Sequence, residues 1–94
     1  MNINRGMFEW DSEKEASNIK KHGIDFSTAM LVFNDENYLE WYDEEHSKTE
    51  ERYNVLGLVH DVIFVVYTER KDNIRIISAR LATGWERSLY YDRN

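Results

Sequence analysis

The chain contains no cysteine and no proline, only four glycines, and no long hydrophobic segment. Without cysteine, the protein can form neither a disulfide framework nor a thiolate metal site, and it cannot use a cysteine nucleophile. No apolar run approaches the roughly 20 residues that a membrane-spanning helix needs, and residues 1–10 lack the apolar stretch of a signal peptide. These absences predict a cytoplasmic protein with no membrane partner.

The length of 94 residues corresponds to one small domain. No repeat, low-complexity segment or linker rich in proline, glycine or serine divides the chain, so we expect a single domain over residues 1–94. A domain of this size buries only about 60 to 65% of the surface that its unfolded chain exposes. Its stability would therefore benefit from an obligatory partner.

The charged residues are unevenly distributed along the chain. With 12 basic and 18 acidic residues, the net charge is −6, which by itself argues against a nucleic-acid partner. However, residues 35–51 have a net charge of −7, whereas residues 70–94 have +3. A basic surface for an anionic ligand could thus coexist with an acidic surface for a cationic partner, although ordinary solvated faces more often account for such patterns.

The first third of the chain predicts a short strand followed by two helices. Apolar residues alternate over residues 8–10, as in an edge strand. Asp11 or Ser12 can cap a helix that runs to about residue 22, where Gly23 supplies the left-handed conformation that ends many helices. Apolar residues recur at helical spacing over residues 26–34, which predicts a second helix.

The remaining residues predict strands and a final helix. Residues rich in aromatic and β-branched side chains over 38–42, 52–59, 62–68 and 74–79 predict four antiparallel strands. Thr83 followed by Glu86 has the spacing of a capping box, which predicts a short C-terminal helix. Helices must cover the sheet to bury the apolar strand 62–68. We therefore expect an α+β fold.

Three ordered blocks of the sequence carry a specific resemblance. Residues 8–33 read FEWDSEKEASNIKKHGIDFSTAMLVF, residues 50–57 read EERYNVLG and residues 65–90 read VVYTERKDNIRIISARLATGWERSLY. This series resembles the BrnT toxins over roughly residues 8–91. The resemblance implies a RelE-like fold, with an antiparallel β-sheet, two N-terminal helices and a short C-terminal helix.

The resemblance also implies an activity and partners. A BrnT toxin is an endoribonuclease that arrests translation by cutting RNA, without a cofactor. A BrnA antitoxin, a ribbon-helix-helix protein, neutralises it, so that operator DNA is contacted only indirectly through the antitoxin. Two other hypotheses remain open: a non-catalytic partner that binds the antitoxin and serves in autorepression, and a housekeeping RNA-binding domain.

Arginines are the candidates for contacts with RNA. Cleavage through the RNA 2′-hydroxyl needs a base, an acid and cations that stabilise the charge on the reacting phosphate, but no metal ion. Arginine suits the last role because its planar donors match phosphate oxygens. Arg80 and Arg70 are the catalytic candidates; the RNA-binding candidates are Arg52, Arg75, Arg87 and Trp85. Arginines at strand ends can alternatively form salt bridges at the sheet edge.

The candidates for proton transfer are fewer. Glu51 precedes Arg52 at the start of a predicted strand and is the candidate base, although a solvated surface carboxylate is more common. Lys21 and His22 could supply a cation and an acid, but cations in a last helical turn also stabilise the helix dipole. His46 and His60 are expected in loops. Because the three histidines are scattered, we expect no metal site.

Overall fold

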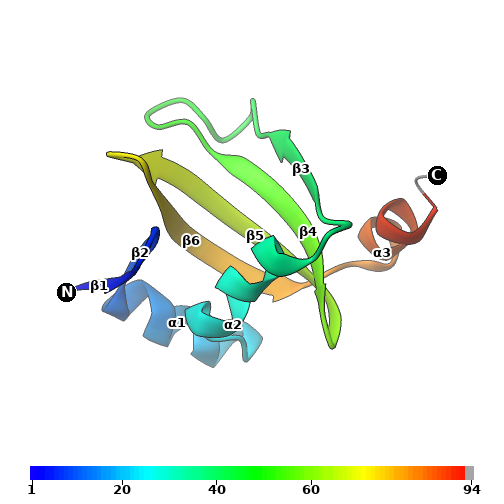
Figure 1. Ribbon diagram of the computed structural model, residues 1–94, viewed down its shortest axis with the longest axis horizontal. Coiled ribbons are helices and arrows are strands. Elements are labelled where there is room, and N and C mark those ends of the chain that lie inside the picture. Colours follow the sequence, from blue (N-terminus) through cyan, green and yellow to red (C-terminus); the bar gives the residue numbers. More distant parts are fainter. Residues whose placement is uncertain (93–94) are drawn as a thin grey trace.

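Six strands form one sheet in the order β1-β2-β6-β5-β4-β3 in the computed structural model, which describes residues 1–92 (Figure 1). The strands are β1 (Asn2–Arg5), β2 (Phe8–Asp11), β3 (Leu39–Tyr42), β4 (Tyr53–Val59), β5 (Asp61–Arg70) and β6 (Asn73–Leu81). The helices are α1 (Ser12–His22), α2 (Phe26–Met30) and α3 (Gly84–Tyr91), and a 3₁₀ helix, η1 (Leu31–Asn34), directly follows α2. Arg93, which we counted in the basic C-terminal segment, lies outside the described residues.

The helix ends follow the sequence signals. The Asp11 side chain accepts a hydrogen bond from the backbone N–H of Lys14, and Gly23 ends α1 with a φ of 74°. Thr83 and Glu86 form the complete capping box at the start of α3. The predicted second helix over residues 26–34 is wrong in part, because its second half tightens into the 3₁₀ helix η1.

The sheet differs from the expected antiparallel sheet in two respects. Strand β1 was not predicted, and it pairs with β2 as an antiparallel hairpin. Strand β2 then pairs with β6 in parallel, through Phe8 with Ile74 and Glu9 with Arg75. The sheet is therefore only mostly antiparallel. The expectation failed because this pairing joins segments more than 60 residues apart, and no turn between neighbouring strands specifies it.

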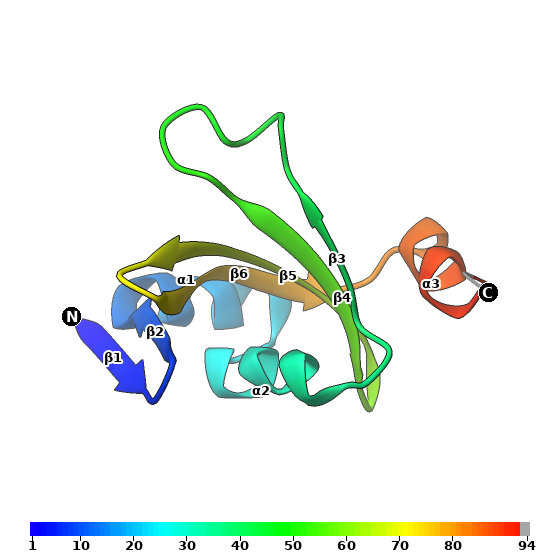
Figure 2. The same cartoon turned by 45° about the horizontal axis from the view of Figure 1, so that its top comes forward.

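The two faces of the sheet bury different apolar clusters. On one face, α2 and η1 place Phe26, Ala29 and Val32 against Val55 and Val65 of β4 and β5. Gly57 permits the close approach, because a Cβ added there would lie 2.6 Å from the Cβ of Val32. The opposite face is covered at one end by α3, which Figure 2 shows well separated from α1 and α2. The residues of this second cluster include Leu56, Val62, Phe64, Leu89 and Tyr90.

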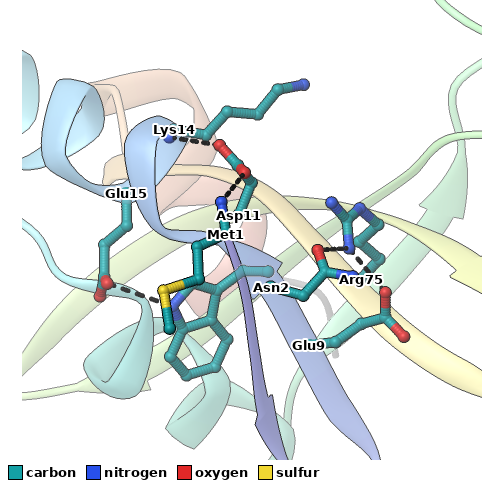
Figure 3. A network of polar contacts seen from close by, with 8 residues as sticks. Met1, Asn2, Glu9, Asp11, Lys14, Glu15 and Arg75 are labelled. Atoms are coloured by element: carbon teal, nitrogen blue, oxygen red, sulfur yellow. Dashed lines mark hydrogen bonds and ion pairs between the residues drawn. The ribbon is translucent and has the colours of Figure 1, made fainter.

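Polar contacts fix the sheet around β2, which was expected to be an edge strand but lies between β1 and β6. Figure 3 shows Arg75 of β6 between Glu9 and Asn2, with distances of 2.6 Å to Glu9 Oε2 and 3.1 Å to Asn2 Oδ1. Beside this group, Asp11 also accepts a hydrogen bond from the N-terminal amine of Met1. Further along β6, Asn18 of α1 donates to the carbonyl of Ala79 and accepts from its N–H. Helix α1 is thus anchored to the part of β6 that β2 leaves unpaired.

Candidate active site

A cleft of about 470 Å³ lies on the sheet face opposite α2. Its floor follows from the strand register, because Trp41, Asn54, Val66 and Ser78 form one row across β3, β4, β5 and β6. These side chains alternate with those of the buried cluster under α2, so they point to the other side of the sheet. The next row places Arg80 opposite Phe64. The loop between β3 and β4 completes the wall with Asp43, Glu45, His46 and Arg52.

Arg80 is held in place on three sides. Its Nη1 and Nη2 donate to the two carboxylate oxygens of Glu86 in α3, over 2.8 and 3.0 Å. The guanidinium carbon lies 4.1 Å from the centre of the Phe64 ring, and Nη1 also donates to the carbonyl of Leu81. Its side chain remains 33% exposed. Arg80 therefore presents a fixed cation at the cleft wall that a ligand can still reach.

Glu86 contributes both to the cleft and to the stability of the fold. The hydrogen bonds from Arg80 lower the pKa of Glu86, outweighing the opposing effect of burial, and the backbone N–H of Thr83 lowers it further. The same carboxylate thus fixes Arg80 and caps α3.

We expect low pH to destabilise the protein through protonation of Glu86. Because the pKa of Glu86 is lower in the folded state than its ordinary value of 4.5, its contribution is fully present above about pH 4.5. The contribution is then lost as the pH falls through the folded-state pKa. Urea unfolding measured between pH 3 and 7 should show a steeper loss below pH 4.5 for the wild type than for Glu86→Gln. Parallel pH curves would contradict this coupling.

Two polar atoms at the cleft are buried without a hydrogen-bond partner among residues 1–92. They are Nε of Arg52 and Oδ1 of Asn54. Arg52 forms an ion pair with Glu50, in which Nη2 lies 3.4 Å from Oε2. A buried donor or acceptor without a partner costs free energy, so these positions favour a bound polar group.

Asp43 and His46 form a pair in the cleft loop. Nδ1 of His46 lies 2.9 Å from Oδ2 of Asp43, and the backbone N–H of His46 donates to Oδ1 over 3.2 Å. The side chains differ in exposure, with 15% for Asp43 and 60% for His46. Burial raises the pKa of Asp43, but the hydrogen bonds from His46 outweigh burial, so this pKa lies below its usual value.

The structure separates the predicted arginines. Arg70 pairs with Asn73 at the far end of the β5–β6 hairpin from Arg80, as the antiparallel register predicts. Arg75 is engaged by Glu9 and Asn2 away from the cleft lining. Arg87 of α3 lies 3.8 Å from Asp61. Of the predicted arginines, Arg52 and Arg80 line the cleft together.

The remaining predicted residues lie outside the main cleft. Trp85 is 74% exposed on α3. Glu51 lies 3.5 Å from the hydroxyl of Tyr53 and is not part of the cleft lining, so its role as base stays a prediction. Lys21 and His22 line a second hollow of about 220 Å³ between α1 and β6. Because Ser78 lines both hollows, the second one adjoins the main cleft.

Sequence reasoning missed several side chains of the cleft. In the sequence, Trp41 and Phe64 lie in segments that predict strands, and His46 lies in a segment that predicts a loop. Nothing in these patterns marks the three residues as part of a site. The spacing of Asp43 and His46 allows the pair within one turn of chain, but the sequence does not say that this turn faces Arg80. That information lies in the register between β3 and β4, which places Trp41 opposite Asn54.

Neither a cluster of metal-binding side chains nor a membrane-spanning helix occurs among residues 1–92. No group of three or more His, Cys, Asp or Glu side chains lies close enough together to hold a metal ion within this range. None of the helices in the same range is both long and apolar enough to cross a membrane.

The fold and the cleft define a small α+β protein with a fixed arginine, a second arginine, aromatic walls and a carboxylate–histidine pair on one sheet face. Such groups suit the binding of a phosphodiester and its cleavage. Residues 10–86 match the family described as the ribonuclease toxin, BrnT, of type II toxin–antitoxin systems, and the chain belongs to this family. A comparison with curated proteins found no match. The chain is thus a ribonuclease toxin that its antitoxin neutralises.

Proposed function

We propose that the toxin cuts RNA without a metal ion, by attack of a ribose 2′-hydroxyl on the neighbouring phosphate, and that the cleft on the sheet is its active site. The observation that carries the proposal is the position of Arg80, which Glu86 and Phe64 hold rigid at the cleft wall. A cation fixed before RNA binds stabilises the charge that develops on the phosphate without reorganisation. Metal independence is expected because the substrate itself supplies the nucleophile.

The other predicted residues would bind the RNA around the scissile phosphate. Arg52 lies in the same cleft and its buried Nε has no partner within the described chain. The exposed ring of Trp41 offers a surface on which a base can stack. Lys21 and His22, which line the adjoining hollow, and Arg70, at the distal end of the hairpin, would contact flanking phosphates. Arg75 and Arg87 lie outside the cleft lining, which weighs against a direct role.

Cleavage of a single-stranded RNA by the purified chain in excess EDTA tests this proposal. We expect cleavage with 2′,3′-cyclic phosphate ends, and the same rate when magnesium replaces EDTA. Cleavage that disappears in EDTA and returns with magnesium would contradict the metal-independent mechanism. An absence of cleavage under both conditions would favour the second candidate function.

That second candidate is a non-catalytic partner which binds the antitoxin and serves in autorepression. It is favoured by the charge balance of the cleft, since Glu86 neutralises Arg80 and the lining also includes Asp43 and Glu45. A growth assay separates the two functions. A catalytic toxin arrests translation when it is expressed without its antitoxin, whereas a non-catalytic partner does not.

We further infer a RelE-like architecture, a cytoplasmic location and a BrnA-like ribbon-helix-helix antitoxin that alone contacts operator DNA. The mostly antiparallel sheet with two N-terminal helices supports the architecture. The acidic segment 35–51, which includes the exposed Glu36 and Glu44, is the surface that suits a basic partner. Electrostatic complementarity of this kind mainly raises the rate of association.

Charge reversal in the acidic segment should therefore slow antitoxin binding. We expect the double variant Glu36→Lys/Glu44→Lys to associate roughly tenfold more slowly than the wild type at low salt, with a smaller difference at high salt. Stopped-flow or surface-based kinetics would measure the rates. Glu69→Lys, an exposed reversal on β5, is the matched control. Equal rates for the double variant and the wild type at low salt would show that the acidic segment does not contribute to association with the antitoxin.

A further inference from the structure

The cleft contains one titratable pair to which the proposed RNA contacts give no role. Asp43 and His46 both line it, together with Arg52 and Arg80. The pair is fixed by two contacts, because the Asp43 carboxylate meets both Nδ1 and the backbone N–H of His46. An imidazole held by a carboxylate beside a phosphate-binding arginine has the chemistry of a proton acceptor.

We propose that His46 is the general base that takes the proton from the attacking 2′-hydroxyl, and that Asp43 is its positioning residue. This inference rests on the proposed ribonuclease mechanism. It replaces the sequence-based expectation that assigned the base to Glu51, whose side chain lies outside the cleft lining.

The contact with Asp43 selects the reactive form of the ring. An ionised carboxylate can only accept a hydrogen bond, so the neutral His46 ring carries its proton on Nδ1. The lone pair of Nε2 is then free to accept a proton. The lowered pKa of Asp43 keeps its carboxylate ionised at neutral pH. Asp43 thus orients the ring, sets its tautomer and stabilises the imidazolium that forms.

The surroundings of His46 allow RNA to reach it. Its side chain is 60% exposed, whereas that of Asp43 is 15% exposed. The charged groups that share the cleft with the ring are Asp43 and Glu45 of its own loop, Arg52 next to β4 and Arg80 of β6. Strands β3 and β5 contribute Trp41, Phe64 and Val66, none of which titrates near neutral pH.

The reaction step balances with these groups. Nε2 of His46 accepts the 2′-hydroxyl proton while the 2′-oxygen forms a bond to phosphorus. The bond between phosphorus and the 5′-oxygen of the next nucleotide breaks, and this oxygen takes a proton from a solvent water. The hydroxide that remains takes the proton from the His46 imidazolium, which restores the base. The products are a 2′,3′-cyclic phosphate and a free 5′-hydroxyl. Arg80 and Arg52 stabilise the negative charge on the phosphate oxygens during the transfer.

Single-turnover cleavage of a defined RNA by His46→Ala tests the assignment. Loss of a general base typically costs about 100- to 10,000-fold in rate, and we expect a loss in this range. Added imidazole should restore part of the rate, because the substitution leaves space in an exposed part of the cleft. The pH dependence that a general base gives to the wild-type rate should disappear in the variant. His60→Asn, in the exposed β4–β5 turn with a φ of 66°, is the matched control and should cleave like the wild type.

Asp43→Asn tests the positioning role separately. An asparagine amide can donate to Nδ1 and thereby favour the tautomer with its proton on Nε2, so we expect a slower reaction with a shifted pH profile. The inference is overturned if His46→Ala cleaves at the wild-type rate with an unchanged pH profile, or if a slower His46→Ala gains nothing from imidazole. A different observation would contradict the proposed function itself: wild-type protein that cleaves no RNA to a 2′,3′-cyclic phosphate.

Discussion

Replacing Arg80 with alanine is expected to lower the rate of RNA cleavage about 100- to 1,000-fold, the typical loss when a fixed donor to transition-state charge is removed. The physical reason is that Glu86 and Phe64 hold the guanidinium in place before RNA arrives. Arg80→Lys should recover only a small part of the rate, because a single ammonium cannot make the paired contacts with Glu86. Quenched single-turnover assays would give both rates.

The stability of the Arg80→Ala variant must be measured together with its activity, because the substitution also removes the two hydrogen bonds that Arg80 donates to Glu86. We expect a lower thermal unfolding temperature but retained binding to the antitoxin. Arg5→Ala is the charge-matched control, since Arg5 lies on β1 near Trp10 and away from the cleft. Wild-type cleavage by a folded Arg80→Ala protein would remove Arg80 from the active site.

A substrate with deoxyribose at the scissile nucleotide should resist cleavage entirely, a loss greater than any single side-chain substitution gives. The nucleophile in the proposed reaction is the 2′-hydroxyl, and no group of the protein can replace it in forming the cyclic phosphate. An otherwise identical all-RNA strand is the control, and the deoxy substrate should act as a competitive inhibitor because its phosphates and bases remain. Cleavage of both strands at comparable rates would exclude internal attack.

The sequence predicted the local elements better than their long-range pairing. Capping by Asp11, the left-handed Gly23 and the box formed by Thr83 and Glu86 are local signals, and the structure confirms all of them. The parallel pairing of β2 with β6 depends on contacts such as Arg75 with Glu9 between distant segments. Such contacts depend on packing of the whole chain, and no local pattern contains them.

The sequence predicted less of the candidate site than of the fold. The sequence identified Arg80 and Arg52 but could not show which arginines reach the cleft, because no local pattern distinguishes Arg75 from Arg80 on the same strand, β6, or from Arg52 just before β4. Only the register shows that Arg75 meets the carboxylate of Glu9 while Arg80 faces the cleft. His46 was placed in a loop correctly, yet the direction of that loop is a property of the folded sheet.

Binding of an uncleavable RNA, followed residue by residue, tests the central claim that the cleft on the sheet is the ribonuclease active site. A short 2′-O-methyl RNA titrated into the isotope-labelled toxin should shift the NMR signals of the Trp41 indole N–H, the His46 ring and the Ser78 and Arg80 amides. Smaller shifts should extend to Lys21 and His22 in the adjoining hollow. Shifts confined to the face covered by α2 and η1, with the cleft signals unchanged, would contradict this account.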